Sequence, residues 1–252
     1  MSFNINVMVR FLFLLCFPLL TMAQVEAKAI QELFNQEKFI KAEAYLKQYL
    51  KSHPNDIQAL ELLGDTYGHQ KKWDEAIISY QSLIHYDDKN ANYHYKYGGV
   101  LGMKALSVSK IRALTIIDDV EAAFIKATEL DANHIDARWA LVEYYMKLPS
   151  FLGGGISSAL PYANTLENLS KVDGYLAKGF IYETDKEPEL AEKYYKLAII
   201  EGGSLVCYDK LTKFYIAQDE PEKAIRNLKA AYKKHQDADL LLQIEAIKKD
   251  NL

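Results

Sequence analysis

An alanine recurs at a nearly constant interval along this chain of 252 residues. Ala42 and Ala76 are 34 residues apart, and Ala191 and Ala224 are 33 residues apart. Four residues after each alanine stands a larger side chain; these are Leu46, Tyr80, Tyr195 and Leu228. A spacing of four places two side chains on the same face of a helix. A self-similar unit of this length indicates a stack of small helical units that bury their apolar faces against one another.

The first half of the unit carries a second pattern. A small residue is followed three positions later by a tyrosine: Gly64 by Tyr67, Gly179 by Tyr182, and Thr212 by Tyr215. An interior glycine costs a helix about 1 kcal/mol relative to alanine, so Gly64 needs a compensating contact. We expect Gly64 and Ala76 to lie where two helices come closest, because only small side chains permit a close approach. Gly68 has no place in this pattern and is expected to face away from the helix pair.

These two patterns together resemble the tetratricopeptide repeat, a family whose unit is two antiparallel helices in about 34 residues. The resemblance implies an all-α fold, a right-handed α-solenoid of antiparallel helix pairs, over residues 24–238. It also implies a capping helix over residues 239–252, since the exposed end of a stack needs a polar outer face. We expect six repeats, with boundaries at 24–56, 57–90, 91–133, 134–171, 172–204 and 205–238.

The third repeat is longer than the period of the others. Phe124 occupies the position of Tyr80 but follows it by 44 residues, about ten more than one period. The excess lies near residues 104–117, where apolar residues recur with mixed spacing. This spacing favours lengthened helices over an irregular loop.

The fourth repeat carries a second insertion near residues 149–158. Pro149 is expected to end the first helix, and Gly153–Gly155 to form a sharp turn. Ser157 or Ser158 is expected to cap the helix that follows. A turn of this composition is similar to one found in exported bacterial tetratricopeptide proteins.

The first 23 residues differ from the rest. After Arg10 comes the apolar run FLFLLCFPLLTMA, which is shorter than the about 20 residues of a membrane-spanning helix. This pattern is typical of a secretory signal peptide, with cleavage expected after Ala23. An uncleaved anchor, a lipoprotein with Cys16 as the lipidated residue, and a start at Met8 stay open as alternatives. We expect export to the periplasm or the cell exterior.

The sequence offers little for catalysis or cofactor binding. A formal net charge of −4 argues against a nucleic-acid partner. None of the six histidines is spaced from another histidine or a cysteine as in common metal sites. The glycine-rich turn is followed by Ile156 rather than by the lysine and hydroxyl residue of a phosphate loop. Cys207, at helical spacing from apolar neighbours, is expected to be a small buried hydrophobe. We therefore expect a protein that is not an enzyme and has no cofactor or metal.

In the tetratricopeptide family the first helix of each repeat lines the inner surface of the stack, so the register predicts which side chains point inward. The middle repeats place mostly apolar and aromatic residues there. The candidate contact residues are Tyr95, Met103, Arg138, Tyr145, Met146, Leu176 and Phe180. Glu61 and Asp65 stand at positions where some family members hold a partner's terminal carboxylate with basic and amide side chains, and this argues against such a clamp. An apolar segment of a partner protein fits these residues better.

The leading hypothesis is a protein- or peptide-binding scaffold of the cell envelope without enzyme activity. One alternative is a small-molecule or lipid carrier whose apolar cavity is closed by the insertion near residues 104–117. A second is a structural subunit of an envelope assembly that makes contacts through a convex or end surface. If the insertion folds over the inward residues, those residues are ordinary core.

Overall fold

The computed structural model describes residues 30–250, and all regular secondary structure in this range is helical. The expected signal segment, residues 1–23, lies outside the described residues. The helices are α2 (Phe39–Ser52), α3 (Ile57–His69), α4 (Trp73–Tyr86), α5 (Ala91–Ser107), α6 (Lys110–Ala113), α7 (Ile117–Leu130), α8 (Ile135–Lys147), the 3-10 turn η1 (Ser150–Leu152), α9 (Ile156–Leu169), α10 (Lys171–Thr184), α11 (Pro188–Glu201), α12 (Leu205–Ala217), α13 (Pro221–His235) and α14 (Asp239–Asp250). Of these described helices, none combines the length and the apolar character needed to cross a membrane. The all-α fold class predicted from the sequence is confirmed.

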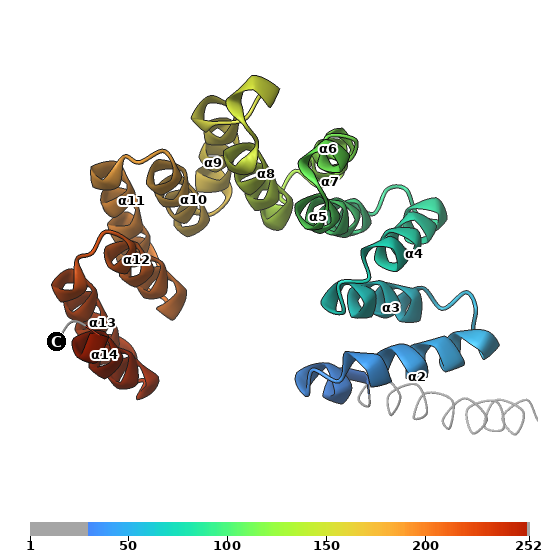
Figure 1. Ribbon diagram of the computed structural model, residues 1–252, viewed down its shortest axis with the longest axis horizontal. Helices are drawn as coiled ribbons and strands as arrows, with labels where there is room; N and C mark the ends of the chain where they lie inside the picture. Colours follow the sequence, from blue (N-terminus) through green and yellow to red (C-terminus); the bar gives the residue numbers. More distant parts are fainter. Residues whose placement is uncertain (1–29, 251–252) are drawn as a thin grey trace, which may run out of the picture. The chain divides into compact units, whose positions relative to one another are not determined.

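The chain forms two compact bodies, and Figure 1 labels their helices. The N-terminal body comprises the described residues up to Lys89 together with residues 100–116, so it holds α2, α3, α4, the end of α5 and α6. The C-terminal body comprises residues 90–99 and the residues from Ile117 onward, so it holds the start of α5 and helices α7 to α14.

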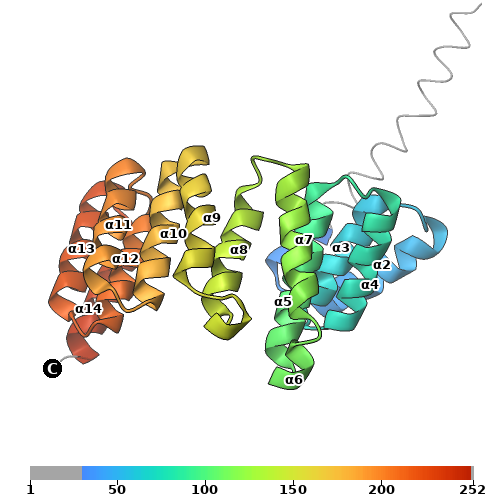
Figure 2. The same cartoon turned by 90° about the horizontal axis from the view of Figure 1, so that it is seen from above.

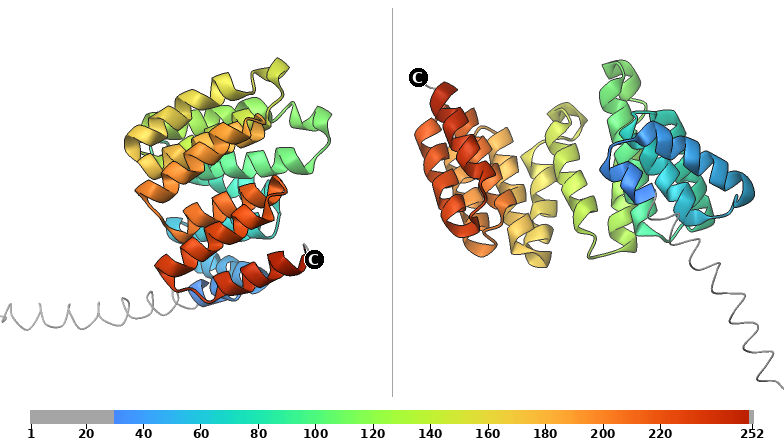
Figure 3. Two further views of the ribbon diagram at one scale, coloured as in Figure 1. Left: turned by 90° about the vertical axis from the view of Figure 1, so that its left-hand side faces the viewer. Right: turned by 90° about the horizontal axis from the view of Figure 1, so that it is seen from below.

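Within each body, helices pack mainly on their neighbours in sequence. In the C-terminal body α8 pairs with α9, α10 with α11 and α12 with α13, and α14 packs on α13. Figures 2 and 3 show these helices side by side from several directions. In the N-terminal body α3 pairs with α4, and α2 packs on α3. Contacts of this kind define a helical solenoid.

The recurring residues of the sequence pattern form the core of both bodies. The four recurring alanines are fully buried: Ala42, Ala76, Ala191 and Ala224. The larger side chains four positions later are at most 2% exposed: Leu46, Tyr80, Tyr195 and Leu228. The register predicted from the sequence is therefore the register of the packing.

Gly64 allows α3 to approach a buried tyrosine ring on α4. A Cβ on Gly64 would lie only 3.0 Å from Cζ of Tyr80. The hydroxyl of Tyr80 donates a hydrogen bond of 2.5 Å to Asp65, which fixes the ring in place. The closest contacts of Gly64 are thus with the second helix of its pair, as expected, but they come from Tyr80 rather than from Ala76. A Cβ on Gly68 would have no heavy atom within 4 Å, as expected for a glycine that does not face the partner helix of its pair.

The same arrangement recurs in the C-terminal body. A Cβ on Gly179 would lie 2.5 Å from Cε1 of Tyr195, whose hydroxyl donates to Glu183 at 2.5 Å. A Cβ on Gly98 would lie 2.8 Å from the ring of Phe124. In each pair the missing side chain of the glycine makes room for an aromatic ring, and this contact offsets the helical cost of the glycine.

The insertion of the third repeat is divided between two helices. α5 continues to Ser107, the four-residue helix α6 follows at Lys110–Ala113, and α7 begins at Ile117. Helices thus account for most of the additional residues, as the apolar spacing predicts.

The second insertion forms a turn that depends on glycine. Gly153 has φ +89° and Gly155 has φ +113°, values that other residues rarely adopt. Gly155 occupies the N-cap position of α9, so the expectation that a serine caps this helix is wrong. Ser157 and Ser158 lie inside the first turn, where the hydroxyl of Ser158 donates instead to the carbonyl of Gly153 at 2.7 Å.

Candidate functional site

The first helices of three successive repeats are neighbours in the C-terminal body. α10 contacts both α8 and α12, although a second helix separates them in sequence each time (Figure 1). We call the accessible side of α8, α10 and α12 the first-helix face. Six of the seven candidate contact residues belong to this body, whereas Met103 belongs to the N-terminal body and is not part of the site described here.

Tyr95 and Arg138 lie around His134 at the start of α8. The ring of Tyr95 is half-buried, with its centroid 5.1 Å from that of His134 and 6.2 Å from that of Phe124. Arg138 is buried, and its Nη1 donates to the carbonyl of His134 at 3.0 Å. Burial lowers the pKa of the Arg138 guanidinium, and the nearby Asp131 acts in the opposite direction. Arg138 is therefore packed against its own helix rather than presented on the surface.

Tyr145 links three helices. Its hydroxyl donates to the carboxylate of Glu121 on α7, and its ring stacks on Tyr162 of α9 with centroids 5.6 Å apart. Burial, followed by the hydrogen bond to Glu121, raises the pKa of Tyr145. The side chain is half-buried, so part of it stays accessible.

Met146 and Phe180 are brought together by one core cluster, which contains Val142, Ala159, Ala163, Leu166, Ala177 and Ile181. Both side chains are half-buried at its edge, together with Tyr145. Leu176 belongs to a different cluster, where it is buried with Tyr195 and other side chains. Of the candidate residues, Met146, Phe180 and Tyr145 thus pack against one core cluster, and Leu176 is buried in another.

The most accessible apolar side chains of this face lie on α12. None of the candidate contact residues comes from this helix. Ile216 is 51% exposed and Val206 is 57% exposed. Between them Lys213 forms an ion pair of 2.8 Å with Asp209. All four residues occupy inward positions of the repeat register, so the register is the signal that identifies them. They are not among the candidate contact residues because the candidates come from the middle repeats, where most inward positions are apolar or aromatic.

A second recess lies elsewhere on the same body. A cleft of about 490 Å³ opens between α11, α12 and α13. Its lining includes the apolar side chains Ile199, Ile200 and Leu211, with Lys196 and Arg226 also in the lining. No group of three potential metal ligands occurs in this cleft or anywhere else in residues 30–250.

Glutamates at one repeat position connect each of three repeats to the next. Glu43, Glu121 and Glu192 each directly follow the buried residue at the recurring alanine position of a second helix, which is Ala42, Val120 or Ala191. Glu121 accepts the hydroxyl of Tyr145, and Glu192 accepts the hydroxyl of Tyr215 at 2.8 Å. These contacts fix the relative position of neighbouring repeats. These contacts are not among the sequence predictions, although the shared register of the three glutamates is a usable signal for them.

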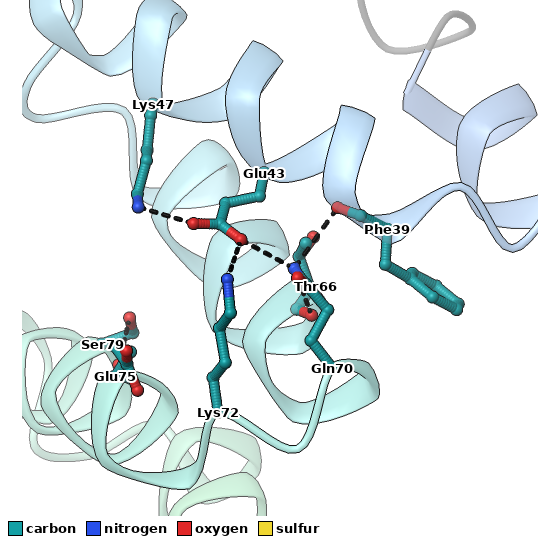
Figure 4. A network of polar contacts seen from close by, with 8 residues as sticks. All are labelled: Phe39, Glu43, Lys47, Thr66, Gln70, Lys72, Glu75 and Ser79. Atoms are coloured by element: carbon teal, nitrogen blue, oxygen red, sulfur yellow. Dashed lines mark hydrogen bonds and ion pairs between the residues drawn. The ribbon is translucent and has the colours of Figure 1, made fainter.

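Glu43 in the N-terminal body accepts hydrogen bonds from three side chains (Figure 4). Its carboxylate accepts from Lys47 and Lys72, both at 2.6 Å, and from Nε2 of Gln70 at 2.9 Å. The hydrogen bonds from Lys47 and then Lys72 lower the pKa of Glu43 to about 2, although burial acts in the opposite direction. Because Gln70 ends α3 and Lys72 precedes α4, Glu43 holds the α3–α4 turn against α2.

Comparisons with known proteins agree with this architecture. Residues 28–94 match the sequence model of the family described as tetratricopeptide repeat. A tetratricopeptide repeat protein from Parabacteroides merdae aligns with 90% of this chain and 86% of its own, at 15% identity and a TM-score of 0.57. PilW, a type IV pilus biogenesis factor, aligns with 88% of this chain and 98% of its own, at 16% identity and a TM-score of 0.59. Residues 28–94 thus match the tetratricopeptide repeat family, and the described helices have the fold of a solved tetratricopeptide repeat protein.

A curated relative matches a shorter segment. Protein O-mannosyl-transferase Tmtc3 of Drosophila melanogaster is 39% identical over 59 residues, which are 23% of this chain and 6% of the relative. Because the match covers so small a part of the relative, the activity of that protein is not assigned to this chain.

Proposed function

We propose that this chain is a scaffold without enzyme activity that binds an apolar segment of a protein or peptide on its first-helix face. The observation that carries the proposal is the exposure of Ile216 next to a helix on which Phe180 is only half-buried. Apolar side chains gathered on an accessible face are typical of a binding surface. Tetratricopeptide repeat proteins generally serve as protein-interaction scaffolds, and this supports the same assignment.

The charged groups of the face favour an apolar segment over a terminal carboxylate. Lys213 is neutralised by Asp209, and Glu183 accepts the hydroxyl of Tyr195. Asp173 accepts the indole N–H of Trp139 at 3.1 Å. These groups already have partners within the body, so apolar contact supplies most of the binding energy in this proposal.

The exposed insertion weakens the carrier alternative. A carrier requires the apolar residues of the insertion to cover a cavity, but Leu106, Ile111 and Leu114 are exposed. Binding of a peptide to an open face requires no such cover.

Replacement of Ile216 by aspartate tests the binding face. Peptides are first selected from a random library for binding to the chain beginning at Gln24. Their affinity for the Ile216→Asp variant should be about tenfold lower, because the substitution removes an apolar contact and adds a charge. Fluorescence anisotropy of labelled peptides gives the dissociation constants. Phe180→Ala and Tyr145→Ala should also weaken binding, but both side chains pack against the core, so Ile216→Asp is the cleaner variant.

Ile200 provides the matched control. It is 79% exposed on α11, away from the first-helix face, and lines the cleft between α11 and α13. Ile200→Asp should leave peptide affinity unchanged. The reverse result, with Ile200→Asp disrupting binding and Ile216→Asp having no effect, would transfer the site to the cleft and reject the proposed face.

We further propose that the protein works outside the cytoplasm, in the periplasm or at the cell exterior. The apolar run after Arg10, with small residues at its end, supports this location. The intact mass of protein recovered from the envelope or medium of an exporting host should lack residues 1–23. A chain that retains Met1 or Met8 would contradict cleavage after Ala23.

A further inference from the structure

The insertion of the third repeat ends in a projecting tip of the N-terminal body. α5 extends to Ser107 and α6 follows at Lys110–Ala113. Figure 2 shows α6 at the end of α5, beyond the ends of α2, α3 and α4, and the right-hand view of Figure 3 agrees. We call residues 103–116 the insertion tip.

Large apolar side chains of the insertion tip face solvent. Ile111 is 80% exposed, Leu106 is 66% exposed and Leu114 is 50% exposed. Single exposed apolar residues are common on protein surfaces, but three within nine residues of one projecting segment form a patch. The helical repeat packing does not use these side chains.

The charge of the insertion tip has one sign. Residues 103–116 include Lys104, Lys110 and Arg112 and no acidic residue. Lys104 pairs with Asp74 at 2.5 Å. Neither Lys110 nor Arg112 forms an ion pair with any residue in the described part of the chain. Two accessible cations therefore flank the apolar patch.

We infer that the insertion tip docks on the anionic lipid headgroups of a membrane surface. Ile111, Leu106 and Leu114 enter the boundary between headgroups and acyl chains, and Lys110 and Arg112 contact the headgroup phosphates. Apolar side chains with flanking cations are the features by which peripheral segments bind anionic membranes. This contact is independent of peptide binding, because the tip belongs to the N-terminal body and the first-helix face to the C-terminal body.

The shape and composition of the tip favour a membrane over a protein partner. A stable protein interface buries about 1,000 Å² or more and is enriched in aromatic residues. The tip is a narrow turn around the four-residue helix α6, and residues 103–116 contain no aromatic side chain. A fluid lipid surface accommodates a narrow projection that a flat protein surface would leave mostly uncovered.

Vesicle binding tests the inference. The chain beginning at Gln24, which keeps every described helix and omits the apolar run near the N-terminus, is sedimented with phosphatidylcholine vesicles with and without phosphatidylglycerol. Binding should require phosphatidylglycerol. Ile111→Asp should lower the partition coefficient more than tenfold, and Lys110→Gln with Arg112→Gln should lower it about fivefold for each charge removed.

Ile78 supplies the control, since it is an exposed isoleucine on α4 of the same body, outside the tip. Ile78→Asp should bind vesicles as the parent does, and circular dichroism should show equal helix content in all variants. Equal vesicle binding by Ile111→Asp and Ile78→Asp would overturn the inference. Vesicle binding by the parent that does not depend on phosphatidylglycerol would overturn it as well. Self-association of the parent that Ile111→Asp abolishes, without vesicle binding, would also overturn it and assign the tip to a protein contact.

Discussion

Replacing Gly174 by alanine is expected to lower the free energy of unfolding of the C-terminal body by about 2 to 3 kcal/mol. A Cβ at this position would lie 2.2 Å from Cα of Glu167 and 2.4 Å from its backbone nitrogen. These are main-chain atoms of α9, so relief requires two helices to move apart rather than a side chain to rotate. The gain in helix propensity, about 1 kcal/mol, offsets only part of this cost.

The connection between α9 and α10 explains the close approach. α9 ends at Leu169 and α10 begins at Lys171, so Ser170 alone joins them. The hydroxyl of Ser170 also caps α10, because it accepts a hydrogen bond from the backbone N–H of Asp173. Farther from the turn, Lys178 forms an ion pair with Glu167 across the same two helices. A one-residue connection and this ion pair leave little freedom for α9 and α10 to separate.

The two tryptophans of the chain allow this change to be measured in one body at a time. Trp73 lies in the N-terminal body and Trp139 in the C-terminal body. In a Trp73→Phe background, Trp139 alone reports urea unfolding, and its indole donates to Asp173, the residue before Gly174. The unfolding midpoint of Gly174→Ala should therefore fall clearly below that of the parent in the same background.

Gly99→Ala is the matched control for this substitution. A Cβ on Gly99, in α5, would have no heavy atom within 4 Å. The free energy of unfolding should therefore rise by about 0.5 to 1 kcal/mol, because alanine favours the helix and restricts the unfolded chain. If Gly174→Ala matched Gly99→Ala, the close contact between α9 and α10 would be wrong.

Gly174 and Gly64 differ in how far the sequence reveals their roles. Gly64 recurs in register as Gly179 and Gly98, so periodicity alone predicts that each faces a large residue of its partner helix. Gly174 belongs to no recurring position. Its role depends on a connection of one residue after a lengthened repeat, and that geometry follows from tertiary packing rather than from the repeat pattern.

The candidate site shows a similar division. The register predicts that α8, α10 and α12, which are neighbours in the C-terminal body, share one face, but it does not predict which side chains on that face are accessible. Leu176 and Arg138 are buried, whereas Ile216 is exposed. Burial depends on the spacing of adjacent repeats, which the sequence specifies only indirectly through contacts such as those of Glu43 and Glu192.

Replacing Glu43 by glutamine is expected to lower the free energy of unfolding of the N-terminal body by about 2 kcal/mol at pH 7. The Glu43 side chain is 12% exposed, and its charge is compensated by Lys47 and Lys72. Glutamine keeps the shape but leaves both ammonium groups without their counter-charge. The lowered pKa of Glu43 sets an upper limit of about 3 kcal/mol on this loss of stability. The expected loss is smaller than the limit because both lysines are partly exposed to solvent.

The difference between parent and variant should depend on pH. The carboxylate of Glu43 has a folded-state pKa of about 2 against an ordinary 4.5, so the stability it contributes is complete above about pH 5 and is lost as pH falls toward 2. Glutamine does not titrate, so the difference should fall to about half its value by pH 3. Urea unfolding followed through Trp73, in a Trp139→Phe background, measures it at each pH.

Asp74 separates the effect of burial from that of an ion pair alone. Its carboxylate lies 2.5 Å from Lys104 in the same body, but the side chain is 74% exposed. Asp74→Asn should therefore cost less than about 1 kcal/mol at pH 7, since exposed ion pairs contribute little. A loss from Glu43→Gln that equals that of Asp74→Asn would show that burial adds nothing to the Glu43 contacts. A large loss that stays constant between pH 7 and pH 3 would assign the stabilisation to packing of the side chain, because a contribution from its charge must disappear as the carboxylate is protonated.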